Sequence, residues 1–227
     1  MKAGAFGFAG WDAKMSQRNI FCRLNVRVAT CVLATMVGGM AGCGGAHPMQ
    51  YYQLTVPAEK PHSSEVNASG VSLALGPLVA SHLYREDRIV YSADALRMGT
   101  YEFQRWSEPP AEMIQEVLVR ELRASGRYRD VSLQRSSGRA DYVLHGRLYD
   151  FKEVSGEPLQ ARVTMEFDLR DTKSGATVWS HYYNHDEPVG GKDVQAMVAA
   201  LDRNVQRCVE DVKASLDQYF SSLPANK

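Results

Sequence analysis

The sequence predicts a single α/β domain, and three observations support that fold class. Residues 161–171 alternate strictly between apolar and polar side chains, which is the period of a β-strand with one buried face. From about Asp193 the apolar residues recur at threes and fours, which is the period of an amphipathic helix. The chain has 227 residues, of which 44% are apolar and 23% charged, and these values suit one globular domain. We therefore expect one domain that contains both strands and helices.

Seven segments are rich in aromatic and β-branched residues and are expected to be extended. They are residues 51–56, 71–75, 88–91, 100–106, 142–151, 161–171 and 178–184. Gly76-Pro77 is expected to end the second segment, and residues 57–70 are predicted to form a loop. Thr172-Lys173-Ser174-Gly175 predicts a hairpin turn in which Gly175 supplies a positive φ.

The segment 161–171 carries the clearest pattern in the chain. Its two faces are expected to differ, one buried and one in water. The buried face should hold Ala161, Val163, Met165, Phe167 and Leu169, and the wet face Arg162, Thr164, Glu166, Asp168 and Arg170.

A helix is predicted to begin at Pro110, because the missing N–H of proline costs nothing at the first helical position. Its apolar stripe comprises Met113, Ile114, Val117, Leu118 and Leu122. Ser125-Gly126 is expected to end it, with the glycine in the left-handed region.

The C-terminal helix is predicted to have some 28 residues and a length of about 42 Å. Cys208 lies on its apolar stripe and is expected to be buried. Because this length is more than one small sheet would cover, we expect the end of the helix to pack elsewhere or to project.

The first 42 residues differ from the rest in charge. They carry five basic side chains and one acidic side chain, a net charge of +4, so the remaining 185 residues carry −4. An uncharged run at residues 28–42 follows Arg27, and a basic segment before an apolar one is typical of a secretory signal. A transmembrane helix is not favoured, because a span needs about 20 apolar residues and glycines interrupt the end of this run.

Met40-Ala41-Gly42-Cys43 resembles a bacterial lipobox, in which the cysteine thiol receives a diacylglyceryl group. The usual leucine is replaced by Met40, and the alternative is an ordinary signal peptide that contains a cysteine. Met15 is an alternative start of the leader. Gly44 follows the cysteine, and by resemblance to enterobacterial lipoprotein sorting, in which an aspartate there favours retention in the inner membrane, outer-membrane sorting is expected.

This interpretation divides the chain into a signal peptide (1–42), a lipidated tether (43–50), one domain (51–223) and a tail (224–227). Cys22 and Cys31 leave with the leader and Cys43 is acylated, which leaves Cys208 as the last free thiol. The mature chain is therefore expected to have no intramolecular disulfide. A fully extended tether of about seven residues reaches at most about 25 Å, so the domain should lie close to the membrane.

The sequence offers little for catalysis or metal binding. A pI of about 7.0 argues against a nucleic-acid partner. His181 and His185 share one face of a strand but lie about 13 Å apart, too far for one zinc ion, and are expected to be solvated. Gly190-Gly191-Lys192 lacks the rest of a phosphate-binding loop. We expect no catalytic residue, no cofactor and no metal, and a membrane-anchored hydrolase would need a nucleophile and base that the sequence does not show.

An aromatic segment before the first helix is open to two interpretations. In one it is a core strand with Trp106 packed against the helix that begins at Pro110. In the other it is a surface for lipid or a protein partner, because aromatic and arginine side chains are enriched at interfaces. The candidate surface residues are Tyr101, Phe103, Arg105, Trp106, Pro109 and Pro110.

The order of motifs resembles that of a known family. After the lipobox come Tyr51-Tyr52-x-Leu54, Tyr101-Glu-Phe-Gln-Arg-Trp-x-x-Pro-Pro110, Ala140-Asp-Tyr-x-Leu-x-Gly-Arg-Leu-x-Asp-Phe151 and Gly175-x-x-x-Trp179, and then the final helix. Over residues 43–223 this is similar to the ABC-type transport auxiliary lipoprotein family, which includes the paraquat-inducible protein C lipoproteins.

The resemblance implies an α/β fold with a mixed sheet, similar to the amino-terminal domain of the Tol–Pal translocation protein B. It implies a non-enzymatic component of the envelope that accompanies ABC transporter subunits and mammalian-cell-entry-type lipid-carrier proteins. Cys43 carries over as the lipidation site, whereas Trp106, Pro109 and Pro110 carry over without a mechanism.

We therefore expect a lipid-anchored periplasmic adaptor of a lipid transport system. Its expected partners are the membrane, through the acyl chains on Cys43, a carrier protein, ABC transporter subunits and, at the aromatic segment, lipid. The alternative is a lipoprotein that regulates a cell-wall synthase or assists outer-membrane assembly. The sequence permits a homo-oligomeric ring or a monomer equally.

Overall fold

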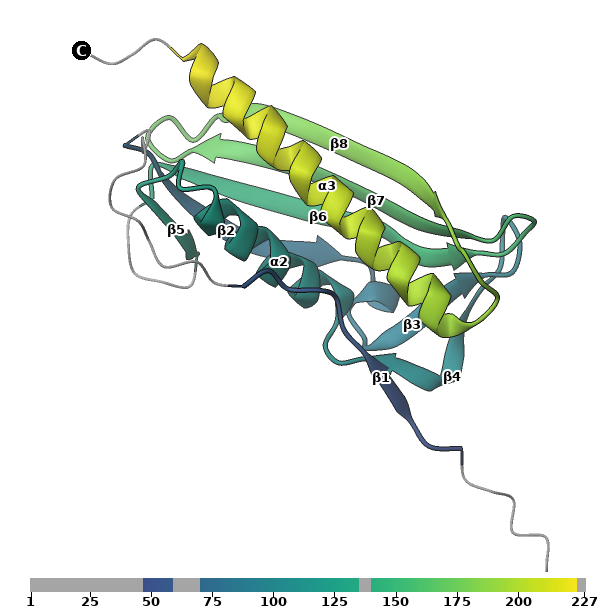
Figure 1. The fold of residues 1–227 in the computed structure, drawn as a ribbon. Coiled ribbons are helices and arrows are strands. Elements are labelled where there is room, and N and C mark those ends of the chain that lie inside the picture. The colour runs from purple at the N-terminus through teal and green to yellow at the C-terminus, as the bar shows by residue number, and fades with distance from the viewer. Residues whose placement is uncertain (1–46, 59–69, 135–139, 224–227) are drawn as a thin grey trace, which may run out of the picture. The chain divides into compact units, whose positions relative to one another are not determined.

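The structure, a computed structural model, describes residues 47–58, 70–134 and 140–223, and Pro48–Lys227 form one compact unit. Within these described ranges one sheet of eight strands is covered by two α-helices (Figure 1). None of the helices described is long and apolar enough to cross a membrane. The predicted signal peptide and Cys43 lie outside the described residues.

The sheet is organised around β6, its longest strand. The strands are β1 (Gln50–Tyr52), β2 (Ser72–Ala80), β3 (Arg88–Ser92), β4 (Met98–Trp106), β5 (Asp130–Leu133), β6 (Tyr142–Val154), β7 (Gln160–Asp171) and β8 (Thr177–Pro188). Along one edge β6 pairs with β7, which pairs with β8, both antiparallel. Along its other edge β6 pairs in parallel with β2 over its first half and with β3 over its second half. β5 extends the sheet beyond β2, and β4 and β1 extend it beyond β3, so the predicted mixed sheet is confirmed.

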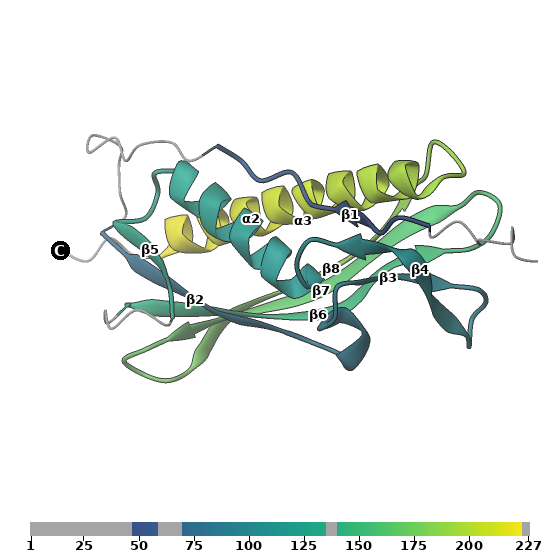
Figure 2. The ribbon, with the colours of Figure 1, turned by 90° about the horizontal axis from the view of Figure 1, so that it is seen from below.

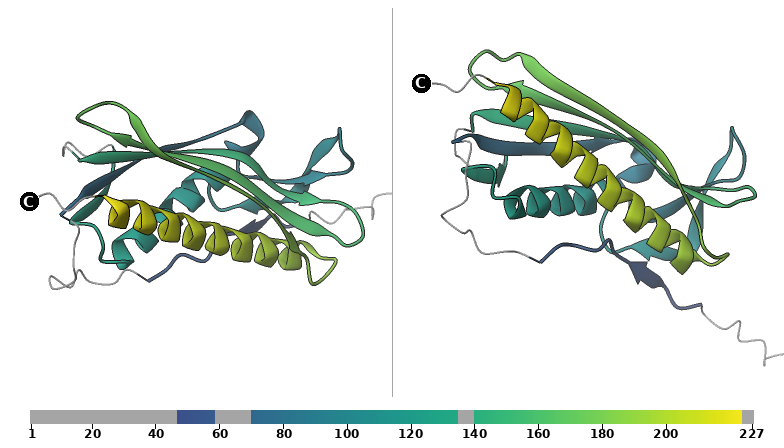
Figure 3. Two further views of the ribbon diagram at one scale, coloured as in Figure 1. Left: turned by 90° about the horizontal axis from the view of Figure 1, so that it is seen from above. Right: turned by 45° about the horizontal axis from the view of Figure 1, so that its top comes forward.

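Both α-helices lie on the same side of the sheet (Figures 2 and 3). α2 (Pro110–Ala124) packs on β2 and β5, and α3 (Val194–Ser222) packs on β6, β7 and β8. A single-turn 3-10 helix, η1 (His82–Tyr84), connects β2 to β3. The helices therefore cover one face of the sheet and leave the other face toward solvent.

The alternation predicted for residues 161–171 is confirmed by β7. Ala161, Val163, Met165, Phe167 and Leu169 are at most 1% exposed and belong to the core beneath the helices. Among the residues between them, Arg162, Glu166 and Asp168 are half-buried and Arg170 is exposed, while Thr164 is buried by its neighbours. The turn after β7 holds Gly175 at a φ of 72°, as predicted.

The helix boundaries also agree with the prediction. Pro110 is the first residue of α2, and Gly126, at a φ of 63°, follows its C-terminal end. Asp193 caps the N-terminus of α3, where its side chain accepts a hydrogen bond from the N–H of Ala196 at 2.7 Å. The predicted stripe of α2 is buried along its whole length.

The predicted strand 51–56 is wrong after Tyr52. Leu54 turns into the core and is 1% exposed. The backbone N–H and the hydroxyl of Thr55 both donate to the carboxylate of Asp202 at 2.8 Å, and the Gln206 side chain donates to the Thr55 carbonyl at 2.9 Å. Side chains of α3 thus replace a neighbouring strand as the partners of this backbone.

The predicted end of the second strand at Gly76-Pro77 is also wrong, because β2 continues to Ala80. The register between β2 and β6 shifts between Leu75 and Leu78, so the pair Gly76-Pro77 sits in a β-bulge. Proline is tolerated in a bulge because its backbone has no N–H that would need a hydrogen-bond acceptor on the neighbouring strand. The sequence prediction also missed β5, which has four residues.

Of the two expectations for the end of α3, that it would pack elsewhere or project, the structure agrees with the first. The helix has 29 residues, about 44 Å, while β7 and β8 have 12 residues each, about 40 Å. Near its C-terminal end Phe220 makes edge-to-face contacts with Tyr128 and Tyr142, with ring centroids 5.7 and 5.3 Å apart. The long hairpin of β7 and β8 therefore supports nearly the whole helix.

Cys208 is 1% exposed on α3, as predicted, and its thiol lies 3.9 Å from the sulfur of Met165. Burial raises the pKa of this thiol well above its ordinary value. Cys208 is therefore an unreactive core residue.

Phe151 tests the core of the sheet. The change Phe151→Ala should lower the free energy of unfolding by about 3–5 kcal/mol. Phe151 is 1% exposed and packs on Trp106, with the ring centroids 5.2 Å apart. The matched control is Tyr149→Ala, since Tyr149 lies two residues earlier and is 43% exposed. Urea unfolding of both variants measures the difference, and equal losses would contradict the assignment of the two faces.

Candidate functional site

The aromatic segment predicted as a partner surface divides into buried and half-buried residues. Trp106 is 1% exposed and Pro110 is buried at the start of α2. For these two the core interpretation holds and the surface interpretation is wrong, because both side chains are buried and the Trp106 ring packs on Phe151. Tyr101, Phe103, Arg105 and Pro109 are half-buried.

Tyr101 and Arg105 have partners within the domain. The Tyr101 hydroxyl donates to a carboxylate oxygen of Glu153 at 2.6 Å, and the Arg105 guanidinium donates to the Tyr101 carbonyl at 3.1 Å. Burial and the neighbouring Glu153 carboxylate raise the pKa of Tyr101 above its ordinary value. The first contact joins β4 to β6, whereas the second lies within β4.

A group of aromatic and charged side chains lies instead on the solvent side of the sheet. Arg147 on β6, Glu166 on β7 and Tyr182 on β8 are in register across three strands. Tyr149 donates its hydroxyl to Glu166 at 2.6 Å, and the Arg147 guanidinium carbon lies 5.9 Å from the centre of the Tyr149 ring. Tyr149 and Tyr182 are 43% and 62% exposed. We call Arg147, Tyr149, Glu166 and Tyr182 the open-face cluster.

Polar cross-strand pairs join β7 to β8, two of the strands that carry this cluster. Arg162 donates two hydrogen bonds to Asp186, both at 2.7 Å, and the hydroxyl of Thr164 donates to Asn184 at 3.1 Å. The hydrogen bonds from Arg162 hold the pKa of Asp186 below its ordinary value. The face is therefore polar and ordered, with two exposed tyrosines on it.

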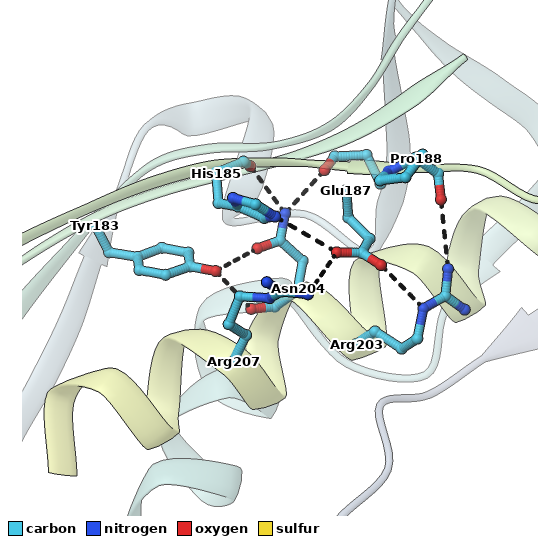
Figure 4. Close-up of polar contacts among 8 residues, drawn as sticks. Tyr183, His185, Glu187, Pro188, Arg203, Asn204 and Arg207 are labelled. Carbon is cyan, nitrogen blue, oxygen red and sulfur yellow. Dashed lines mark hydrogen bonds and ion pairs between the residues drawn. The ribbon is translucent and has the colours of Figure 1, made fainter. Parts of the chain in front are cut away.

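On the opposite side of the sheet a buried polar cluster joins β8 to α3 (Figure 4). Asn204 is 0% exposed, and its side-chain amide donates to the carbonyls of Ala161 and His185, each at 2.9 Å. Its side-chain oxygen accepts a hydrogen bond from the Tyr183 hydroxyl at 2.7 Å. Asn204 thus bonds two strands of the sheet and a tyrosine at once, which fixes where α3 sits along β7 and β8.

Glu187 provides a second bond between the sheet and the helix. It is 8% exposed, and its carboxylate lies 3.2 Å from the guanidinium groups of both Arg203 and Arg207 (Figure 4). His185 lies 3.5 Å from the same carboxylate. A carboxylate this buried requires such partners, so the cluster is accounted for as a structural contact between β8 and α3.

The two histidines of β8 do share one face, but that face is turned to α3 and not to solvent. The ring of His181 stacks on Trp179 and lies 3.0 Å from a carboxylate oxygen of Asp211 on α3. The expectation that both would be solvated is therefore wrong for His181, whose side chain is 19% exposed, whereas that of His185 is 36% exposed. Among the described residues, no group of three or more His, Cys, Asp and Glu side chains is placed to hold a metal ion.

A groove of about 440 Å³ runs between α2 and residues 53–56. Its lining includes Leu54, Val56, Met113 and Leu133, together with Gln53, Ser107, Glu108, Glu112, Gln115, Glu116 and Arg120. Polar side chains outnumber apolar ones, and Glu116 and Arg120 form an ion pair. A site for a lipid tail would need a mostly apolar lining, so this groove does not favour lipid.

Sequence reasoning missed the open-face cluster. Arg147 and Tyr149 stand in one predicted strand, Glu166 in the next and Tyr182 in the third. The alternation of residues 161–171 does place Glu166 on the wet face. Finding the other three requires the register of β6, β7 and β8, and a β-bulge at Tyr149 shifts that register.

The fold and these surfaces define a two-layer α/β domain with one face under two helices and one polar face toward solvent. The model of the ABC-type transport auxiliary lipoprotein component family matches residues 52–213. The chain belongs to this family, which places it among the auxiliary lipoprotein components of ABC-type transport that are associated with the cell envelope.

Two solved structures with TM-scores of 0.60 or more agree with the fold. A protein from Xanthomonas campestris is 18% identical, with a TM-score of 0.65 over 76% of this chain and 96% of that chain. A second, uncharacterised protein is 13% identical, with a TM-score of 0.60 over 75% of this chain and 99% of that one. The PelC dodecamer from Paraburkholderia phytofirmans is 18% identical, with a TM-score of 0.38 over 68% and 95%. No curated protein matches the chain.

Asn204 tests the bond between helix and sheet. The change Asn204→Ala should lower the free energy of unfolding by about 2–4 kcal/mol, because it leaves buried carbonyl groups and the Tyr183 hydroxyl without their partner. Asn184→Ala is the control, since Asn184 is an exposed asparagine on β8 that pairs with Thr164. Its loss should stay within about 0.5 kcal/mol in urea unfolding. A cost for Asn204→Ala as small as that of the control would refute this role.

Proposed function

We propose that the protein is a lipid-anchored adaptor of an ABC-type, mammalian-cell-entry-type lipid transport system. In this proposal residues 1–42 are a signal peptide and the acyl chains on Cys43 hold the domain on a bilayer, with Gly44 favouring the outer membrane. Residues 48–227 then face the periplasm and hold a carrier protein. The observation that carries the adaptor role is the open-face cluster, which lies on the sheet face that neither α2 nor α3 covers (Figures 2 and 3).

The composition of this face suits a protein partner. Tyrosine and arginine are enriched at interfaces, because they combine apolar area with hydrogen-bonding groups. Tyr149 is already held by its hydrogen bond to Glu166, and Arg147 lies over the Tyr149 ring, so little side-chain entropy would be lost when a partner binds them. Confinement of the domain to a membrane raises its effective concentration near a partner, so a weak interface suffices.

The anchor is tested by Cys43→Ala in the full chain. This change should move the protein from the membrane fraction to the soluble fraction, because the acyl chains supply the membrane affinity. Its unfolding transition should match that of the unaltered domain, since Pro48–Lys227 form their own compact unit. Fractionation and urea unfolding measure both results, and retention in the membrane fraction would refute the anchor.

The partner surface is tested by co-purification from envelope extracts. The double change Tyr149→Ala and Tyr182→Ala should reduce recovery of a carrier protein or ABC transporter subunit about ten-fold or more, the effect of losing two interface aromatics. Tyr51→Ala is the matched control, because Tyr51 is 65% exposed but lies on β1, across the sheet.

Each outcome separates the candidates. Loss of the carrier with the double variant and not with Tyr51→Ala supports the proposal. Equal recovery with both variants would refute the open-face cluster as the docking surface. Recovery of a cell-wall synthase or an outer-membrane assembly factor instead would favour that alternative function.

A further inference from the structure

The tip of the β3–β4 hairpin exposes two apolar side chains. Leu96 is 96% exposed and Met98, at the start of β4, is 50% exposed. An exposed apolar residue is ordinary on a protein surface. A leucine that an ordered loop keeps almost wholly in water is less common than a singly exposed apolar residue. The loop that carries Leu96 is of this ordered kind.

Asp94 orders the tip. One of its carboxylate oxygens accepts the backbone N–H groups of Leu96 and Arg97, both at 2.9 Å, and the other accepts the Arg97 guanidinium at 2.6 Å. The Ser92 hydroxyl donates to the Asp94 carbonyl at 2.7 Å, and the N–H of Ala93 donates to the Arg97 carbonyl at 2.9 Å. These bonds close the loop from within, and Leu96 projects from the closed loop.

The register shows what lies beside this tip. Ser92 pairs with Met98 and with Val154, Val154 pairs with Gln160, and Gln160 pairs with Pro188. The hairpin tip, the β6–β7 turn and the loop before α3 therefore lie at one end of the sheet. Figure 2 shows that β1 also begins toward this end.

The chain reaches β1 from Cys43, and the lengths agree. Gln50 is in parallel register with Gln104, six residues after Met98, so the start of β4 lies at most about 20 Å beyond the start of β1. Six residues lie between Cys43 and Gln50, and the seven steps from one Cα atom to the next reach at most about 25 Å. The tether is thus long enough to place Cys43 level with the hairpin tip and too short to carry the domain far from the bilayer.

We propose that Leu96 and Met98 form a membrane-contact tip that inserts into the surface of the bilayer that holds the acyl chains. The proposal rests on the acylation of Cys43 stated under the proposed function. A lipid surface fits better than a protein partner. A stable protein interface buries about 800 Å² on each side, which two side chains on a narrow loop do not supply. Insertion of single apolar side chains beside an existing anchor needs no such area.

The test places a polarity-sensitive fluorophore at the tip of the full, acylated chain. Leu96→Cys is labelled and compared with Ser174→Cys, an exposed residue in the turn after β7, at the opposite end of the sheet. Cys208 is 1% exposed and should not react, and both substitutions lie at solvent-exposed loop positions that should not affect folding. The vesicles contain phosphatidylethanolamine and phosphatidylglycerol, with a fraction of nitroxide-labelled lipid as quencher.

With the tip in the bilayer, emission from position 96 should shift to the blue and be quenched several-fold more than emission from position 174. Equal emission and equal quenching, with the protein still on the vesicles, would overturn the tip and leave the anchor intact. A blue shift at position 96 that requires an added envelope protein and comes without quenching by the nitroxide lipid would identify a protein contact and overturn the lipid assignment. Failure to sediment with vesicles would overturn the anchor and the tip together.

Discussion

The packing of α3 on β6, β7 and β8 is the contact on which the rest of the domain depends. Its apolar stripe, including Leu201, Val205 and Val212, is fully buried against the core face of the sheet. Apolar packing alone would tolerate a shift of α3 along the sheet, because one apolar side chain of the stripe could take the place of another. Asn204 prevents such a shift, because a buried side-chain amide is stable only where its donors and its acceptor all have hydrogen-bond partners. The position of α3 then determines which face of the sheet is covered, and thereby which face a partner can reach.

The sequence predicted an element correctly where its periodic pattern of apolar residues was long. Twelve residues of β7 and 29 of α3 gave clear periods, and both elements agree with the structure. The errors fall where tertiary contacts replace local preference. Residues 53–56 have β-forming side chains, but Asp202 and Gln206 on α3 take their backbone groups. Gly76-Pro77 reads as a strand end, yet a bulge carries β2 through it, and β5 has four residues, too few to show a period.

The candidate surfaces divide in the same way. Composition drew attention to the segment that ends at Trp106, because aromatic residues gather there, but composition cannot tell a buried tryptophan from an exposed one. The open-face cluster comes from three separate strands, and nothing in any one of them marks Tyr149 or Tyr182. Register is a property of the folded sheet and of the bulge at Tyr149. The sequence does not mark Leu96 for a similar reason. Its exposure depends on hydrogen bonds that Asp94 accepts in the closed loop.

The two proposed surfaces lie on different parts of one sheet, and this has a physical consequence for an adaptor. The membrane-contact tip belongs to the loops at the end of the strands, whereas the open-face cluster projects from their flat side. Contact with a bilayer at the strand ends therefore leaves the open face directed along the membrane surface and accessible from the periplasm. An acyl anchor alone would allow the domain to rotate freely about its tether. A second contact at Leu96 would restrict that rotation and present Arg147, Tyr149 and Tyr182 to a partner in one orientation, which lowers the entropy lost when the partner binds.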